Sequence, residues 1–151
     1  MKKKENKNIE ILKFKWENDF EYKYRNTIHQ ISTEVQKVMG HLSLYSGKEN
    51  PDYSPVLKII QEQYDKLLKQ DIPLIYLETN KLLVKGYQYY IKAFKRLIYI
   101  FKNMNLQDQK TFSEVQFCGK LIECGTAYVK ICSISNNEIF REKEYGKFII
   151  E

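Results

Sequence analysis

The sequence predicts an all-α fold, a compact helical bundle of about four helices with an irregular N-terminal arm. Helix breakers are rare, since the 151 residues include only 3 prolines and 6 glycines. Apolar residues recur at helical spacing in long segments, and short polar loops separate these segments. We expect a basic N-terminal arm at residues 1–26, a helical bundle domain at 27–135 and a C-terminal tail at 136–151.

The N-terminal arm has a pattern of its own. In "KFKWENDFEYKY" aromatic and polar residues alternate, which is typical of a strand. We therefore expect residues 9–24 to form a hairpin or an irregular docking arm. The alternating aromatic residues are Phe14, Trp16, Phe20, Tyr22 and Tyr24.

The first helix of the bundle begins near Thr27, where the spacing of apolar residues becomes helical. Its apolar face carries Ile28, Ile31, Val35, Val38, Met39 and Leu42. The stretch "YSGKENPDYSP" then predicts a loop, because it contains Gly47, Pro51 and Pro55.

Three further helices follow, joined by short connections. Ser54 is the expected N-cap of the second helix, because a proline follows it at the first helical position. Asp71 is expected to cap the third helix, which has Pro73 in its first turn and runs to about Met104. The turn "NLQDQ" leads to a fourth helix over about 109–133.

The composition is compatible with a nucleic-acid partner, since the net charge is +6 and the pI is about 9.0. Cys118, Cys124 and Cys132 form no CxxC pair, and His29 and His41 are far from them in the sequence. We expect no metal site, no cofactor and no disulfide, but reduced thiols in a cytoplasmic protein. The basic start has no apolar run long enough for a signal peptide, and no transmembrane helix is expected.

The segment 81–107 carries five lysines and one arginine but no aspartate or glutamate. On a helical wheel its charged residues gather on one side, opposite an apolar face that includes Leu83, Tyr90 and Phe94. We call the charged side the basic face. Its residues are Lys81, Lys85, Gln88, Lys92, Lys95, Arg96, Tyr99 and Lys102.

The basic face favours a polyanionic partner. An ordinary solvated helix mixes glutamate with lysine, because opposite charges four residues apart stabilise it by about 0.2–0.5 kcal/mol per pair. This segment instead places Lys81 four residues from Lys85, and Lys92 four residues from Arg96. A phosphate backbone would neutralise the row, and the uncharged members could bond sugar hydroxyls or stack on bases. The alternative is a lysine-rich solvent face that reflects a biased genome composition.

A catalytic role is not expected, because no Gly-rich phosphate loop, paired carboxylates or Ser/His/Asp set can be assembled. The stretch "RNTIH", from Arg25 to His29, is similar to the RxxxxH motif of the HEPN ribonucleases, which are also helical bundles. Those enzymes need four to six residues between arginine and histidine, and this chain has three. A ribonuclease or toxin of this kind stays open as an alternative, as does a helical protein–protein adaptor of a phage or defence system.

Three stretches of the chain resemble the small subunit of type III-A CRISPR effector complexes, the Csm small subunit. "ISTEVQKVMGHLSLY" is similar to the first helix of that family, and "YDKLL" with "IYLETNKLLVKGYQYYIKAFKRLI" to its central helix. "DQKTFSEVQFCGKLIECGTAYVKI" resembles the closing helix, and the resemblance covers about residues 30–132. The matching positions are Val84, Lys85, Phe117, Cys118, Glu123, Ala127, Tyr128 and Lys130.

The chain also departs from the family's pattern. The family has an arginine near the position of Asn80, where the neighbouring Lys81 is basic here. A basic residue expected near Gln36 is supplied by Lys37, and "CSISNNE" replaces a Gly-rich ending. The segment "KFKWENDFEYKY" has no counterpart.

The resemblance implies a non-catalytic structural subunit. Copies would stack head to tail with other effector subunits and hold target RNA beside the guide duplex through sequence-independent backbone contacts. Exposed aromatic residues such as Trp16 and Tyr22 would then serve subunit contacts. The RNA-binding residues expected on this basis are Lys37, Lys81, Lys85, Lys92, Lys95, Arg96 and Lys130.

Overall fold

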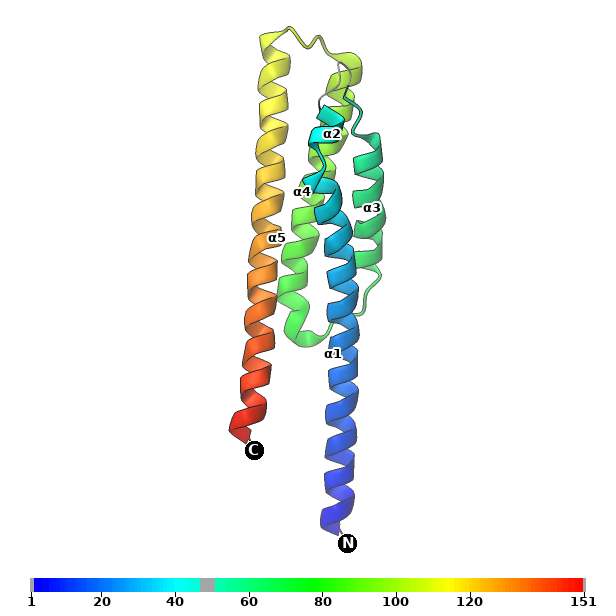
Figure 1. Ribbon diagram of the computed structural model, residues 1–151, viewed down its shortest axis with the longest axis vertical. Helices are drawn as coiled ribbons and strands as arrows, with labels where there is room; N and C mark the ends of the chain where they lie inside the picture. Colours follow the sequence, from blue (N-terminus) through cyan, green and yellow to red (C-terminus); the bar gives the residue numbers. More distant parts are fainter. Residues whose placement is uncertain (1, 47–50, 151) are drawn as a thin grey trace.

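The computed structural model describes the backbone of residues 2–46 and 51–150, and the side chains of residues 19–45 and 51–142. The elements are α1 (Lys2–Gly40), α2 (Ser43–Ser46), α3 (Ser54–Leu68), the 3-10 helix η1 (Leu74–Tyr76), α4 (Leu77–Asn103) and α5 (Gln109–Ile150). The described backbone contains no strand, so the predicted all-α bundle is confirmed. Figure 1 shows the four long helices running alternately up and down, with the start of α1 and the end of α5 at the same end of the molecule.

The helix α4 is the centre of the bundle. It packs against α5 along most of its length and against α3 on another side, while α1 packs on α3. The apolar face predicted for this helix is buried, since Leu83, Tyr90 and Phe94 are at most 4% exposed. The core therefore follows the predicted apolar faces of the helices.

The helices α4 and α5 approach each other closely at two glycines. A Cβ atom at Gly125 would lie 2.7 Å from the ring of Tyr90 and 2.8 Å from the carbonyl oxygen of Gly86. A Cβ atom at Gly86 would lie 3.0 Å from the carbonyl oxygen of Gly125. A side chain at Gly125 would therefore force something to shift, while one at Gly86 would require its neighbours to give by a few tenths of an ångström. The connection between the helices is short and includes a turn in which the amide of Asp108 donates to the carbonyl of Asn105 at 3.1 Å.

The N-terminal arm differs from the prediction, because the backbone of α1 is helical from Lys2 onwards. The alternation of aromatic residues suggested a strand, but the buried positions follow the helical period. Tyr24 is 3% exposed and continues the line of Ile28 and Ile31, whereas Tyr22 is 66% exposed. The side chain of Trp16 and the loop at Gly47 lie outside the described residues.

The C-terminal tail expected at 136–151 is corrected in the same way, because α5 continues to Ile150. The reason is visible beyond Ser133, where the predicted helix ended. Ile139 lies seven residues after the buried Cys132, so it repeats the same helix face, and it packs against the core. The charges around it had concealed this repeat.

Two helix starts also differ from the expected caps. Tyr53 is the N-cap of α3, and the carboxylate of Asp52 accepts the backbone amide of Ser54 at 3.0 Å, which shifts the start by one residue. These hydrogen bonds from Ser54 hold the pKa of Asp52 below its ordinary value. Asp71 does not cap α4, because the 3-10 helix η1 intervenes and α4 begins at Leu77.

Candidate functional site

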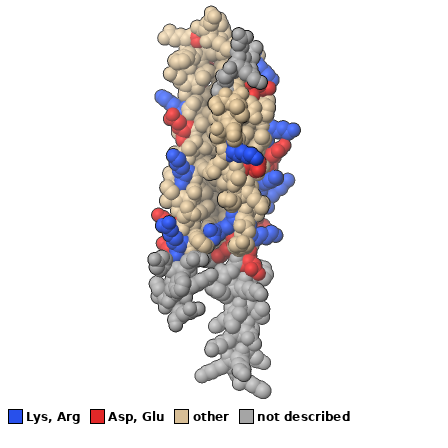
Figure 2. All heavy atoms as spheres, in the orientation of Figure 1, with Lys and Arg blue, Asp and Glu red and all other residues tan. Residues whose placement is uncertain are grey.

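The basic face lies on the outer side of α4. All eight of its residues are exposed, as the helical wheel predicts, while the opposite side of α4 is buried in the core. The face of the molecule in Figure 2 carries charges of both signs, because lysine and arginine lie beside aspartate and glutamate along both of its edges. The concentration of one sign on a single helix therefore distinguishes α4 from an ordinary mixed surface.

Two cations of the basic face have acidic partners that the sequence reasoning missed. Nζ of Lys81 lies 3.1 Å from Oε1 of Glu78, and Nη2 of Arg96 lies 2.7 Å from Oε2 of Glu114 on α5. Glu78 precedes the acid-free segment by three residues, whereas Glu114 reaches Arg96 only because α5 packs beside α4. The first pair is well exposed and contributes about 0–1 kcal/mol, so it holds Lys81 weakly.

The middle of the basic face keeps its cations available. Within the described part of the chain, Lys92 and Lys95 form no ion pair. Lys85 lies 5.1 Å above the ring of Tyr128, which stacks on Tyr89 with ring centroids 5.6 Å apart. A hydrogen bond with Tyr128 raises the pKa of Lys85, so this side chain stays charged. These lysines form the part of the site best placed to bind phosphate.

The uncharged members of the basic face have different roles. Nε2 of Gln88 donates to the hydroxyl of Tyr64 on α3 at 3.0 Å, so this amide joins two helices. Tyr99 is 51% exposed, and the guanidinium of Arg96 lies 5.1 Å from its ring centroid. An exposed ring beside an arginine is a surface on which a base could stack.

The two remaining predicted residues lie on other helices. Lys37 is exposed near the end of α1, where its carbonyl bonds with Nδ1 of His41 at 2.6 Å. Lys130 is exposed on α5, two residues from Tyr128 and therefore about 200° away around the helix. Because Tyr128 faces α4, Lys130 points away from α4. The structure thus groups the predicted residues of α4 and leaves Lys37 and Lys130 outside that group.

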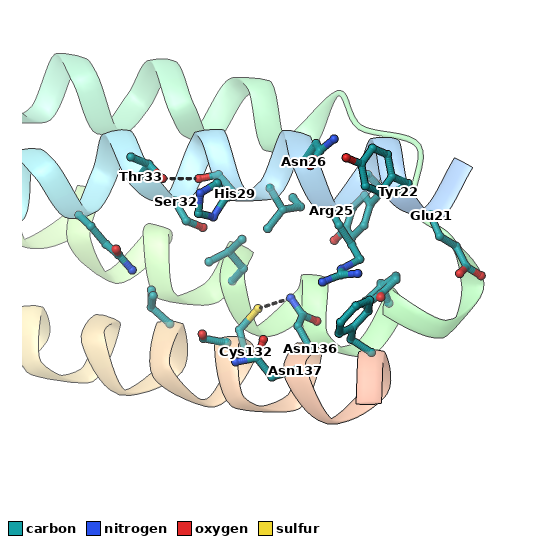
Figure 3. A pocket seen from close by; sticks show the side chains of 18 of the residues that line it. Glu21, Tyr22, Arg25, Asn26, His29, Ser32, Thr33, Cys132, Asn136 and Asn137 are labelled. Carbon is teal, nitrogen blue, oxygen red and sulfur yellow. Dashed lines mark hydrogen bonds between the residues drawn. The ribbon is translucent and has the colours of Figure 1, made fainter. Parts of the chain in front are cut away.

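A groove of about 830 Å³ runs between α1 and α5. In Figure 3 the guanidinium of Arg25 reaches from α1 toward α5, and Asn136 reaches from α5 toward the groove. The Arg25 guanidinium lies 3.6 Å from the centroid of the Phe140 ring, which fixes its position by a cation–π contact. His29 and Ser32 line the α1 wall.

One residue that lines the groove, Asn136, has a buried polar atom without a partner among the described residues. This atom is Oδ1 of its side-chain amide, while Nδ2 of the same amide lies 3.6 Å from Sγ of Cys132. Burial raises the pKa of Cys132 to about 11, so its thiol is neutral and a poor nucleophile.

The sequence did not reveal this groove. The spacing of Arg25 and His29 singled out two residues of the α1 wall. Asn136 and Phe140 line the opposite wall, but they lie in the segment that was expected to be a tail. No group of three or more His, Cys, Asp or Glu side chains among the described residues could hold a metal ion. In the same part of the chain, no helix is long and apolar enough to cross a membrane.

Comparison of the chain with protein-family models, with curated proteins and with solved structures found no match.

Proposed function

We propose that this chain is a non-catalytic RNA-binding protein and that the basic face of α4 holds the RNA backbone. The observation that carries the proposal is the row of Lys85, Lys92 and Lys95, which is exposed along one rigid helix and free of acidic partners among the described residues. Lysines bind phosphate as point charges and do not read bases, so the contact is independent of sequence. Tyr99 adds a ring for stacking at the end of the row.

The finer part of the proposal concerns the assembly. The chain would be a structural subunit of a type III CRISPR ribonucleoprotein in the cytoplasm, where its thiols would stay reduced. It would hold target RNA beside the guide duplex, as the resemblance over residues 30–132 implies. That resemblance is the support for this part.

The test is the affinity for a short, labelled single-stranded RNA of mixed sequence, measured by fluorescence anisotropy over a range of salt concentrations. Three phosphate contacts predict that log K falls with log salt with a slope of about −2. The Lys85→Glu/Lys92→Glu variant is expected to lose binding by at least about tenfold, because repulsion replaces two contacts. Circular dichroism would verify that this variant keeps its helices.

A matched control separates a local site from overall charge. Lys23→Glu/Lys58→Glu makes the same change of charge at exposed positions of α1 and α3. It should weaken binding only slightly. An equal loss in both double variants would overturn the assignment to α4, and single-stranded DNA of the same sequence would show whether the ribose hydroxyls matter.

One observation favours a second function, a ribonuclease. Arg25 and His29 line the same groove, which is also lined by Asn136, a residue whose Oδ1 has no partner in the described part of the chain. A histidine and an arginine in one groove could act on a phosphodiester as a proton-transfer group and a charge stabiliser. This function predicts RNA cleavage that His29→Ala abolishes, and RNA that stays intact after prolonged incubation with the native chain would exclude it.

A further inference from the structure

A stripe of exposed apolar residues follows the outer side of α5. Phe117, Ile131 and Ile134 are 56%, 50% and 60% exposed, and Cys124 and Ala127 are exposed between them. The side of α5 that packs on the bundle is a different one, and it carries the buried Cys118, Leu121 and Cys132. We call the exposed set the α5 stripe. Its residues are Phe117, Lys120, Cys124, Ala127, Ile131 and Ile134.

The spacing of the α5 stripe is that of a two-helix seam. Its residues are separated alternately by three and four positions, which is the a/d pattern of a coiled coil. From Phe117 to Ile134 the stripe extends about 26 Å along the helix. Small residues, Cys124 and Ala127, lie at its centre, where another helix could come close. An ordinary exposed helix side would not repeat apolar residues at this period.

We propose that the α5 stripe binds the α5 stripe of a second copy of this chain in antiparallel orientation, about a twofold axis. In an antiparallel pair an a position faces a d position. Phe117 then faces Ile134 of the second copy, and Cys124 faces Ala127. The one charged residue of the stripe, Lys120, faces Ile131, along which its aliphatic stem can lie.

The charges beside the stripe select this orientation. Glu123 and Lys130 lie on the same flank, and both are exposed. Antiparallel pairing places Glu123 of each copy next to Lys130 of the other, which gives two ion pairs. Parallel pairing would instead set Lys120 against Lys120. It would also leave Glu123 facing Tyr128 and Lys130 facing Ser135, so neither charge would meet an opposite one.

The twofold axis has a consequence for the basic face, and this consequence alone rests on the proposed RNA-binding function. Tyr128 lies on the other flank of the stripe and contacts Lys85 and Tyr89 of α4. In an antiparallel pair the same flanks of both helices lie on one side. The two basic faces would therefore border one side of the dimer and give RNA a longer track. This contact closes on itself, so it is a different contact from the head-to-tail stacking that the resemblance implies.

The first experiment measures the molar mass of the purified chain without RNA by sedimentation over a range of concentrations. A concentration-dependent dimer is expected, and Ile131→Lys/Ile134→Lys should make it monomeric at all of them. Leu74→Lys is the matched control, since Leu74 is 85% exposed but lies on η1. A chain that is monomeric throughout, or a dimer that the double variant leaves unchanged, overturns the proposal.

The second experiment tests the orientation by charge exchange. Glu123→Lys and Lys130→Glu should each raise the dissociation constant of the dimer about tenfold, because both ion pairs become repulsive. The combined variant should return it to near the native value. No recovery in the combined variant would contradict the antiparallel pairing, since these two residues lie seven positions apart and do not meet within one helix.

The third experiment tests the register by disulfide formation. Cys124 is the one exposed cysteine among the described residues, since Cys118 and Cys132 are buried. Ala127→Cys should form a linked dimer on mild oxidation, because the introduced thiol faces Cys124 of the second copy. Cys124→Ser/Ala127→Cys should link far less, whereas a parallel pair would still link through the introduced thiols.

Failure of this proposal and failure of the proposed function are distinguishable. Lys85→Glu/Lys92→Glu changes residues outside the α5 stripe, so it should bind RNA poorly and still dimerise. A native chain that forms the dimer but does not bind RNA would support the proposed contact and overturn the proposed function. A monomer that binds RNA would overturn the proposed contact and leave the proposed function standing.

Discussion

At the scale of single residues, the hydrogen bond between Tyr24 and Asn80 fixes the position of α1. Nδ2 of Asn80 donates to the Tyr24 hydroxyl at 2.8 Å, and both residues are at most 4% exposed. The Tyr24 ring also lies against Tyr76, with centroids 5.3 Å apart. A polar bond inside an apolar core favours one arrangement of the helices over others, because any other arrangement leaves its atoms unpartnered.

Tyr24→Phe is expected to destabilise the fold by about 1–3 kcal/mol, because the buried amide of Asn80 loses its acceptor. Chemical denaturation would measure this loss. Tyr22→Phe provides the control, since Tyr22 is 66% exposed and should change stability little. Tyr24→Phe/Asn80→Leu should cost less than Tyr24→Phe alone, because it leaves no unpaired polar group. A larger cost in the double variant would contradict this account.

Buried acidic groups make the fold sensitive to high pH. Burial raises the pKa of Tyr24 from 10.0 to about 12 and that of Cys132 from 9.0 to about 11. The folded state therefore holds these protons more tightly than the unfolded state, so their contribution is complete below about pH 9 and is lost as pH rises through 11 and 12. We expect the thermal midpoint to fall over this interval, and a midpoint that stays constant up to pH 12 would contradict the assignment.

At the scale of elements, the close approach of α4 and α5 depends on Gly86 and Gly125. A side chain at Gly125 meets a backbone carbonyl at 2.8 Å, and a backbone atom cannot turn aside as a side chain can. Gly119 lies on the same helix, but a Cβ atom there would meet nothing within 4 Å. Within α5, therefore, a side chain is excluded at Gly125 but has room at Gly119.

Gly125→Ala is expected to destabilise the fold by about 1–3 kcal/mol, since overpacking outweighs the better helix propensity of alanine. Gly119→Ala should instead stabilise it by about 0.5–1 kcal/mol, because no contact opposes the gain in propensity. Thermal unfolding of both variants would measure the contrast. Stabilisation by both substitutions would show that α4 and α5 can separate without cost.

The sequence could predict the buried side of each helix, because burial repeats with the helical period. The lines through Ile28 and Ile31 and through Leu83 and Phe94 are both buried as expected. It could not predict contacts between helices, so the Arg96–Glu114 ion pair and the groove beside Arg25 were missed. The alternation of aromatic residues near Tyr22 wrongly suggested a strand in the N-terminal arm, because alternation over a few residues resembles part of a helical repeat.

At the scale of the whole molecule, the bundle is closed on one side and open on another. The helices α4 and α5 pack closely, whereas the groove separates α5 from α1 (Figure 3). Native-state hydrogen exchange should therefore show faster exchange for the amides of α1 near His29 than for those of α4 near Tyr90. Equal protection of both helices would mean that the molecule opens only as a unit.

The short connection between α4 and α5 also predicts an order of folding. Helices joined by a few residues lose little entropy when they come together, while Tyr24 must find Asn80 across 56 positions of the chain. The α4–α5 hairpin would therefore form in the transition state and α1 would dock after it. Substitutions at the glycine crossing would then slow folding, and those around Tyr24 would mainly accelerate unfolding.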